Sequence, residues 1–285
     1  MVLQKIASRW KQYRYRFVPW LVMNLKERSA RKVGGGEQDK VVSDQDVSDI
    51  LKQFFGTLLE DANSENHGDI DAVYKGMFKR QSGCPEISAR NLTLMHQKLG
   101  FSIIREKSKV PGAGTGVIVS KGSVKQGSVV ALYPGAIYQV DDPILLQSIR
   151  NPFVFRCIDN ILIDGNDKGI SKFIYKSCCQ RDRHGALFTS DMSWVTPYPT
   201  NPMAVGQYVN NQNKQYPANV AYQEFDVPED FPPFLRQFIP NVHYAPQGDT
   251  QHSIRLTRTV ALVALRDIQE GEELFSNYFT VVHNS

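Results

Sequence analysis

The sequence has few cysteines, and none of them has a metal-binding spacing. The four are Cys84, Cys157, Cys178 and Cys179. No C-x-x-C pair occurs among them, so we expect no structural zinc site. The adjacent pair at positions 178 and 179 cannot form an ordinary disulfide, because neighbouring Cβ atoms diverge. We therefore expect free thiols and an intracellular, reducing compartment, with the nucleus and the cytoplasm as first choices.

Long apolar runs and paired histidines are also missing. No stretch approaches the ~20 apolar residues that cross a bilayer, and the first turns of the chain are too basic for a secretory signal. The six histidines are scattered, which excludes the paired spacing of a metal hydrolase. Asp164 and Asp167 lie in a loop without the closing glutamate of a calcium site. We expect a soluble chain without a metal ion.

Positive charge is concentrated at the N-terminus. Residues 1–34 hold nine basic side chains and one acidic one, whereas the remaining chain holds 24 basic and 28 acidic groups. The body is therefore mildly acidic, and nucleic-acid binding by its surface is not indicated. The arm, residues 1–33, is a candidate for contact with an acidic surface. Four alternatives stay open for it: an RNA-contacting arm, a mitochondrial transit peptide, a helix on a membrane, or a helix whose aromatic face packs on the body.

The pattern that follows the arm predicts helices. Residues 34–42 begin with three glycines and indicate a linker. Ser43 and Asp46 have the spacing of a capping box, and apolar residues then recur at helical intervals through Leu59. A second helix is predicted over residues 86–99, with Gly100 as its stop. We interpret residues 43–100 as a helical extension without a chemical site.

From residue 101 the period changes to that of short strands, punctuated by Gly, Pro, Asn and Asp. One helix is predicted near residues 231–239, and residues 140–205 form a long, loop-rich insertion region. Residues 101–280 therefore indicate one mostly-β domain. The predicted strands are Phe101–Ile104, Val117–Ser120, Val129–Tyr133, Phe153–Ile158, Ile161–Asp164, Asn219–Phe225, Val260–Leu265 and Leu274–Tyr278.

A glycine-rich loop precedes one of these strands. Gly112, Gly114 and Gly116 suggest a dinucleotide fingerprint, but that fingerprint requires a helix after the loop, and β-branched residues follow here. The loop also lacks the Lys-Ser/Thr ending of a phosphate-binding loop. Two interpretations remain: a turn that needs positive φ, or a place where backbone atoms approach a ligand closely.

Three motifs in one order resemble those of the SET-domain methyltransferase superfamily. The opening motif is K-V-P-G-A-G-T-G-V with Y-P-G at 133–135, and the closing motif is R-D-I-Q-E-G-E-E-L-F-S-N-Y at 266–278. Between them, G-Q-Y-V-N-N-Q at 206–212 and P-A-N-V-A-Y at 217–222 resemble the middle motif. The resemblance covers roughly residues 101–280. It implies an α+β, mostly-β fold of small curved sheets with a pseudoknot, here behind a helical N-terminal extension.

The resemblance also implies chemistry and residues. The family transfers a methyl group from S-adenosylmethionine to a lysine amine of a protein substrate, so that cofactor and that class of partner are expected. Tyr278 resembles the catalytic channel tyrosine, which would orient the amine. The expected cofactor-binding residues are Gly114, Thr115, Gly116, Tyr133, Asn210, Asn211, Tyr278 and Phe279. For Tyr133 a place in the core is an equal alternative.

Several departures keep a second hypothesis open. Position 211 is Asn where the family has His, and Gln212-Asn213 replace its Ser-Cys. A rival alignment places the middle motif at residues 172–178. Flanking zinc clusters are missing, and only seven residues follow Tyr278. The alternative to an enzyme is a SET-fold scaffold or binding module with weak or no catalysis.

Overall fold

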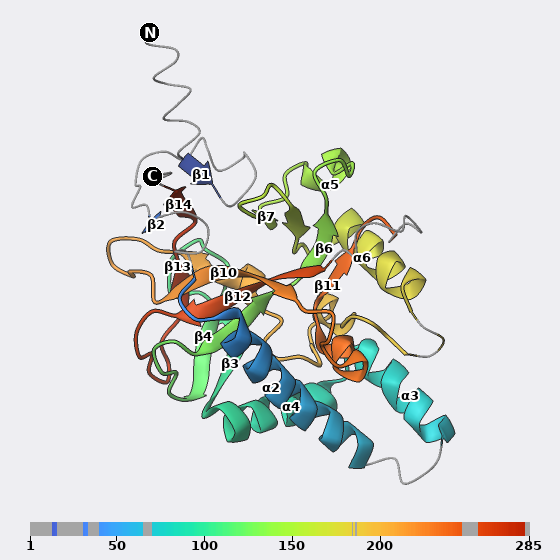
Figure 1. Ribbon diagram of the computed structural model, residues 1–285. Helices are drawn as coiled ribbons and strands as arrows, with labels where there is room; N and C mark the ends of the chain where they lie inside the picture. The colour runs from blue at the N-terminus through green and yellow to red at the C-terminus, as the bar shows by residue number, and fades with distance from the viewer. Residues whose placement is uncertain are drawn as a thin grey trace.

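The computed structural model describes residues 13–15, 31–33, 40–64, 70–183, 185, 187–246 and 256–282. Figure 1 shows three helices, α2, α3 and α4, at one end of the molecule, a group of sheets in the middle, and α5 and α6 at the far side. These helices are α2 (Asp44–Ser64), α3 (Ile70–Gln81), α4 (Pro85–Leu99), α5 (Leu145–Ser148) and α6 (Gly169–Arg181).

The first helices begin and end where the sequence predicts. At α2 the capping box is formed, because Ser43 Oγ donates to Asp46 Oδ2 at 2.6 Å and Asp46 N donates back to Ser43 Oγ at 3.1 Å. At the end of α4, Gly100 adopts φ +82 and donates its N–H to His96 O. Phe55 of α2 packs 5.6 Å, centroid to centroid, from Phe238, so the helical extension shares the core of the sheets.

A five-stranded sheet forms the centre of the fold, in the order β5-β12-β10-β13-β9. Strand β12 pairs antiparallel with both β5 and β10, whereas β13 pairs parallel with β10 and β9. The apolar side chains of the three long strands are almost completely buried. The strands are β5 (Val129–Tyr133), β9 (Asn210–Asn211), β10 (Val220–Val227), β12 (Thr257–Ala264) and β13 (Phe275–Ser276).

Smaller sheets surround this centre. A four-stranded sheet has the order β11-β6-β8-β7, and α6 packs on its β6 and β11 strands. A two-stranded sheet of β3 and β4 carries the glycine loop between its strands. These strands are β3 (Phe101–Lys107), β4 (Thr115–Gly122), β6 (Gly135–Tyr138), β7 (Val154–Arg156), β8 (Leu162–Asp164) and β11 (Asn241–His243); the 3-10 helices are η3 (Ser193–Val195), η4 (Gly206–Tyr208) and η5 (Pro233–Phe238).

The predicted fold class is confirmed: the described chain mixes helices and sheets, and its strands outnumber its helices. Each predicted strand has a counterpart, and the helix predicted near 231–239 is the 3-10 helix η5. The insertion region 140–205 contains α6, which the sequence did not predict. The pseudoknot and the domain boundaries stay predictions. No helix among the described residues is long and apolar enough to cross a membrane.

The described parts of the arm differ from the helical alternatives, whereas the linker over residues 34–42 stays a prediction. Tyr13–Tyr15 (β1) and Arg31–Val33 (β2) are strands that flank β14 (Phe279–Val282), so those segments are not helical. The linker is not free at its end, because Val41 N and Val42 N both donate to Gln223 Oε1 of β10. The helical alternatives for the remaining arm, residues 1–12 and 16–30, lie outside the described residues.

Candidate functional site

The glycine loop enters a strand, as the sequence predicts. Gly112 has φ +81 and Gly114 has φ +75, a backbone conformation that other residues rarely adopt. A Cβ at either position would meet no heavy atom within 4 Å, so open space borders the loop. Gly116 differs: a Cβ there would overlap Glu273 Oε1 and lie 2.8 Å from Glu273 Cδ. The loop therefore has one face open to a ligand and another closed by Glu273.

Glu273 joins the loop to the middle motif, although the sequence reasoning assigned it no role. Its Oε1 accepts from Ser108 Oγ at 2.7 Å and from Asn210 Nδ2 at 3.1 Å, and its Oε2 accepts from Lys109 N at 2.8 Å. The side chain is 3% exposed. A buried carboxylate held by three donors is a strong positioning element, so Glu273 fixes the place of Asn210.

Asn210 lies beside the start of β4, next to the glycine loop. Its Nδ2 also donates to Thr115 O at 3.1 Å, which ties the middle motif to the start of β4. Both bonds use the amide nitrogen, and Oδ1 has no bonding partner within the described part of the chain. Asn210 is therefore able to present a carbonyl oxygen beside the glycine loop, where an ammonium group could bind it.

Two of the three altered positions of the middle motif, Asn211 and Gln212, bond to the closing motif. Strand β9 pairs with β13, and Asn211 Oδ1 accepts from Tyr278 N at 3.1 Å. Gln212 N donates to Ser276 O at 2.9 Å, and Gln212 Oε1 accepts from Ala218 N. The rival stretch, residues 172–178, lies within α6. We therefore place the middle motif at 206–222.

Tyr278 completes this group of residues. Its hydroxyl donates to Val209 O at 2.8 Å, next to Asn210, and its ring lies 6.4 Å from that of Tyr222. The structure thus brings together Tyr278, Asn211, Asn210 and the glycine loop.

Tyr133 lies in the core, which is one of the two positions that its motif left open. Its side chain is fully buried, its hydroxyl donates to Phe153 O at 2.7 Å, and its ring packs 5.2 Å from Phe155 and 6.2 Å from Tyr222. Burial raises its pKa well above the usual range. We therefore assign Tyr133 to the aromatic core behind Tyr278 rather than to a cofactor contact. Phe279 begins β14, and its side chain lies outside the described ones.

A cavity of about 580 Å³ opens beside Thr115. Arg105 crosses its wall, with Cζ 5.4 Å from the ring centroid of Tyr208. The Tyr208 hydroxyl donates to Asp167 Oδ2 at 2.6 Å. The Tyr208 pKa is raised mainly by burial and, to a lesser degree, by this carboxylate. Lys168 and Lys172 also line the cavity. Its polar, mixed-charge wall suits a ligand that carries charge.

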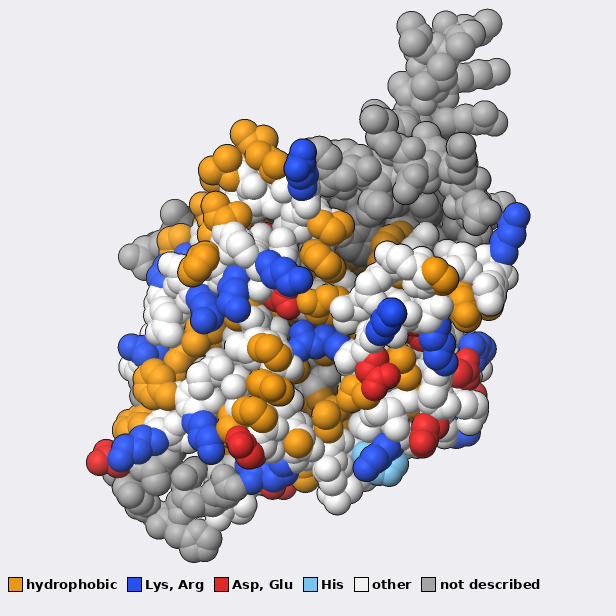
Figure 2. All heavy atoms as spheres, turned by 180° about the vertical axis from the view of Figure 1, so that it is seen from behind, with side chains coloured by type: hydrophobic (Ala, Val, Ile, Leu, Met, Phe, Trp, Pro, Cys, Tyr) orange, Lys and Arg blue, Asp and Glu red, His pale blue; other side chains and the backbone are white. Residues whose placement is uncertain are grey.

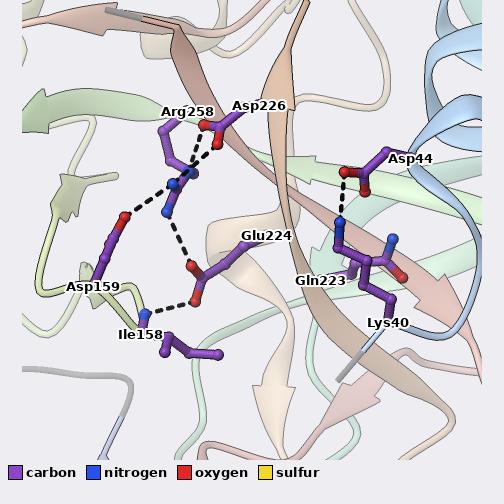
Figure 3. A pocket seen from close by; sticks show the side chains of 8 residues that line it. All are labelled: Lys40, Asp44, Ile158, Asp159, Gln223, Glu224, Asp226 and Arg258. Carbon is purple, nitrogen blue, oxygen red and sulfur yellow. Dashed lines mark hydrogen bonds and ion pairs between the residues drawn. The ribbon is translucent and has the colours of Figure 1, made fainter. Parts of the chain in front are cut away.

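A separate cluster has metal-ligand residue types but a different occupant. Among the described residues, ligand atoms of Cys157, Asp159 and Glu224 lie within 4.8 Å of one another. Figure 3 shows Arg258 pointing into this group, with ion pairs of 2.9 Å to Asp159, 3.0 Å to Glu224 and 2.7 Å to Asp226. Burial raises the Cys157 pKa, which favours the neutral thiol. A guanidinium takes the cation position, so we assign an ion-pair cluster.

Comparison with known proteins gives close relatives. The chain is 45% identical over 299 aligned residues to SET domain-containing protein 9 of Homo sapiens, covering 99% of this chain and 98% of that protein. The protein of the same name from Pongo abelii is 46% identical over 268 residues, covering 88% and 96%. No family model matches the chain.

Solved structures of Polycomb Repressive Complex 2 are more distant matches. One, in an autoinhibited conformation bound to S-adenosylmethionine, has a TM-score of 0.33 at 15% identity, covering 71% of this chain and 19% of that one. A humanized mutant from Chaetomium thermophilum, bound to the inhibitor GSK343, has a TM-score of 0.33 at 16% identity with the same coverage. This chain thus spans about a fifth of those chains. By its near-complete match to the two curated relatives, the chain belongs to the SET domain-containing protein 9 family.

Proposed function

We propose that this protein is an S-adenosylmethionine-dependent methyltransferase that acts on a lysine amine of a protein substrate. Family membership supports the methyltransferase class. The observation that carries the proposal is the convergence of three motifs: Asn210 bonds both Thr115 O and Glu273, while the preceding residue, Val209, accepts from Tyr278. Residues separated by more than half of the domain thus form one site.

The residues of the site fit the cofactor. Gly112 and Gly114 leave open space beside the loop, which admits a ligand against the backbone. Asn210 Oδ1 is a suitable acceptor for the ammonium of the methionine part, and the backbone at Gly114, Thr115 and Gly116 would hold its chain. When bound, S-adenosylmethionine supplies a methyl group on a positively charged sulfur.

Tyr278 would orient the attacking amine. Its hydroxyl donates to Val209 O, which places the phenol beside Asn210, and in the proposed mechanism its oxygen accepts from the lysine amine and aims the nitrogen lone pair. A free lysine has a pKa of about 10.4, and aromatic surroundings such as Tyr222 favour the neutral, nucleophilic form. Alignment in a narrow site then supplies most of the rate.

Two measurements on the full-length protein test this proposal. Calorimetry with S-adenosylmethionine should give saturable one-to-one binding, weakened roughly tenfold or more by Asn210→Ala. Transfer of a tritiated methyl group to protein substrates should yield methyl-lysine on hydrolysis. Tyr278→Phe should retain cofactor binding and lose transfer, whereas Tyr133→Phe, its matched control, should keep both. Absent binding by the folded protein, or label on another amino acid, would contradict the proposal.

A scaffold is the second candidate, favoured by the altered residues of the middle motif. Asn211 and Gln212 use their side chains on Tyr278 N and Ala218 N, which is a structural role. Binding of the cofactor without transfer to any lysine-bearing protein would support this candidate. An intracellular compartment and contact of the basic arm with an acidic surface remain proposals; the buried, free thiols of Cys84, Cys157, Cys178 and Cys179 are consistent with a reducing environment.

A further inference from the structure

An apolar surface is exposed on the two helices of the insertion region. Leu145 is 75% exposed and Phe173 is 73% exposed, although both are large apolar side chains. Figure 2 shows hydrophobic side chains gathered at this edge of the molecule, with basic side chains beside them. The α5–α6 surface is defined here by Val140, Leu145, Leu146, Ile149, Ile170 and Phe173. Contiguous exposed apolar groups of this kind mark interaction sites.

The two helices are fixed to each other. Asn151, just after α5, donates from Nδ2 to Ser171 Oγ of α6 at 3.4 Å. Ile144 and Ile174 both pack on the buried cluster that contains Tyr138 and Tyr175. Because the supporting residues are buried, the exposed side chains stand on a rigid base, and binding them costs little ordering of the backbone.

A basic stripe runs along one flank of this surface. Lys172 and Lys176 are four residues apart in α6, which places them in one row on the helix surface, and Lys168 is the N-cap residue at the start of the helix. Their ammonium groups make no ion pair or hydrogen bond with any other residue in the described ranges. Like charges at this spacing destabilise an isolated helix, so a negatively charged partner would relieve the repulsion.

We propose that the α5–α6 surface binds an acidic segment of a partner protein. Large apolar side chains of that segment cover Leu145, Leu146 and Phe173, while its carboxylates pair with the row of lysines. Asp141 and Asp142 precede α5, so the carboxylates of the partner bind at the α6 side. We choose an acidic partner because its charge complements the row of lysines.

Other occupants fit less well. The N-terminal arm carries nine basic groups and one acidic one, so it repels the lysines. A second copy docked by the same surface brings two basic rows to one interface. An anionic membrane would contact a large area of a body that holds 24 basic and 28 acidic groups, so much of the contact would be repulsive. A short acidic segment would interact only with the nearby lysines, since charges are screened within about 8 Å in physiological salt.

Fluorescence anisotropy with the full-length protein tests the proposal. The probe is a fluorescein-labelled amphipathic helical peptide with Leu and Phe on one face and Glu on the other. One control peptide has Lys in place of Glu, and another has Ser in place of Leu and Phe. The acidic apolar peptide should bind at least about tenfold more tightly than either control, and added salt should weaken it.

Matched variants assign the binding to this surface. Phe173→Ser, and Lys172→Glu combined with Lys176→Glu, should each weaken the acidic peptide by roughly tenfold or more. The controls are Phe234→Ser, at another exposed phenylalanine, and Lys121→Glu, at an exposed lysine on β4. Both should bind the peptide like the parent protein. Circular dichroism verifies that each variant is folded.

Three results would overturn the proposal. The first is equal affinity for the acidic and basic peptides, or affinity that the α6 variants leave unchanged. The second is sedimentation with phosphatidylserine vesicles that Phe173→Ser abolishes, which would assign the surface to a membrane. The third is a dimer in sedimentation equilibrium that the same variant dissociates. None of these readouts requires methyl transfer, so the proposed function stands or falls separately.

Discussion

Replacing Gly116 by alanine tests the construction of the site directly. The added Cβ would overlap Glu273 Oε1 and lie 2.8 Å from Cδ, with Asn210 Nδ2 at 3.4 Å. Glu273 is 3% exposed, and its carboxylate accepts from Ser108, Lys109 and Asn210. The carboxylate therefore cannot move away from the new methyl group without giving up some of these hydrogen bonds.

The size of the effect follows from those bonds. A hydrogen bond to a charged group contributes about 1.5–3 kcal/mol, and a buried group left without its partner costs as much again. If one or two of the three bonds are lost, the free energy of unfolding should fall by roughly 2–5 kcal/mol. Release of Asn210 from Glu273 should also weaken the binding of S-adenosylmethionine by about tenfold.

Urea unfolding followed by circular dichroism measures the first quantity, and calorimetry measures the second. Gly56→Ala is the matched control because Gly56 lies inside α2 and a Cβ there would meet nothing within 4 Å. That change should stabilise the protein by about 0.5–1 kcal/mol. Gly→Ala should therefore lower the free energy of unfolding at position 116 and raise it at position 56. A second control repeats Gly116→Ala in a Glu273→Ala background, where the clash is absent and the cost should shrink.

Two results would refute this reasoning. One is a Gly116→Ala protein as stable as the parent with unchanged cofactor affinity. The other is an undiminished cost in the Glu273→Ala background, which would mean that the methyl group disturbs something other than the carboxylate.

Further predictions concern titration, ion pairing and the two tyrosines. Burial raises the pKa of Asp191 to about 6, so above about pH 4 the native state binds more protons than the unfolded state. The free energy of unfolding should therefore fall by about 3 kcal/mol as the pH rises to 6. Urea unfolding at several pH values measures this pH dependence, and Asp191→Asn should abolish it. Arg258→Met leaves three carboxylates together and should cost roughly 1–3 kcal/mol after allowance for their exposure, against about 0–1 for the more exposed Arg266→Met. Tyr133→Phe should cost about 1–2 kcal/mol of stability without changing cofactor affinity, whereas Tyr278→Phe should abolish methyl transfer. If the two variants had equal effects on stability and on methyl transfer, the separation of core and site would be contradicted.

Local signals account for what the sequence predicted well. The capping box at Ser43 and the glycine stop at Gly100 are decided by residues that lie within one turn of each other, so they can be recognised without tertiary information. The glycine loop before β4 is similar, because β-branched residues follow it at once. The hydrogen bonds of Val41 and Val42 to Gln223 carry no such local signal, since Gln223 lies far away in the sequence.

Long-range packing decides the rest. Glu272 and Glu273 are adjacent and identical in type, yet Glu272 pairs with Arg266 near the surface and Glu273 is buried against Gly116. Successive residues of an extended segment face opposite sides, but the sequence alone does not reveal which side is inside. The short motif at Tyr133 left both the pocket and the core open, and only the position of β5 within the sheet decides for the core.

Helix α6 escaped prediction for a related reason. Its buried residues are Ser171, Tyr175, Cys178 and Cys179, so the inward face is built from tyrosine and cysteine rather than from the aliphatic residues that give a helix a clear apolar stripe. Its large apolar residues Ile170 and Phe173 point outward. Apolar residues on both faces of a helix blur the helical period of the sequence, and the exposed Ile170 and Phe173 are the ones that belong to the proposed partner surface.

The altered middle motif can be compatible with catalysis because of what its side chains contact. Asn211 accepts the backbone N–H of Tyr278, and Gln212 N donates to Ser276 O, so both residues act on the closing motif rather than on a ligand. Loss of the family histidine at 211 therefore need not remove a cofactor contact. The asparagine that replaces it instead accepts from Tyr278 N and so helps to orient Tyr278. Asn211→Ala should consequently lower methyl transfer more than cofactor affinity, and the reverse result would mean that position 211 serves the cofactor after all.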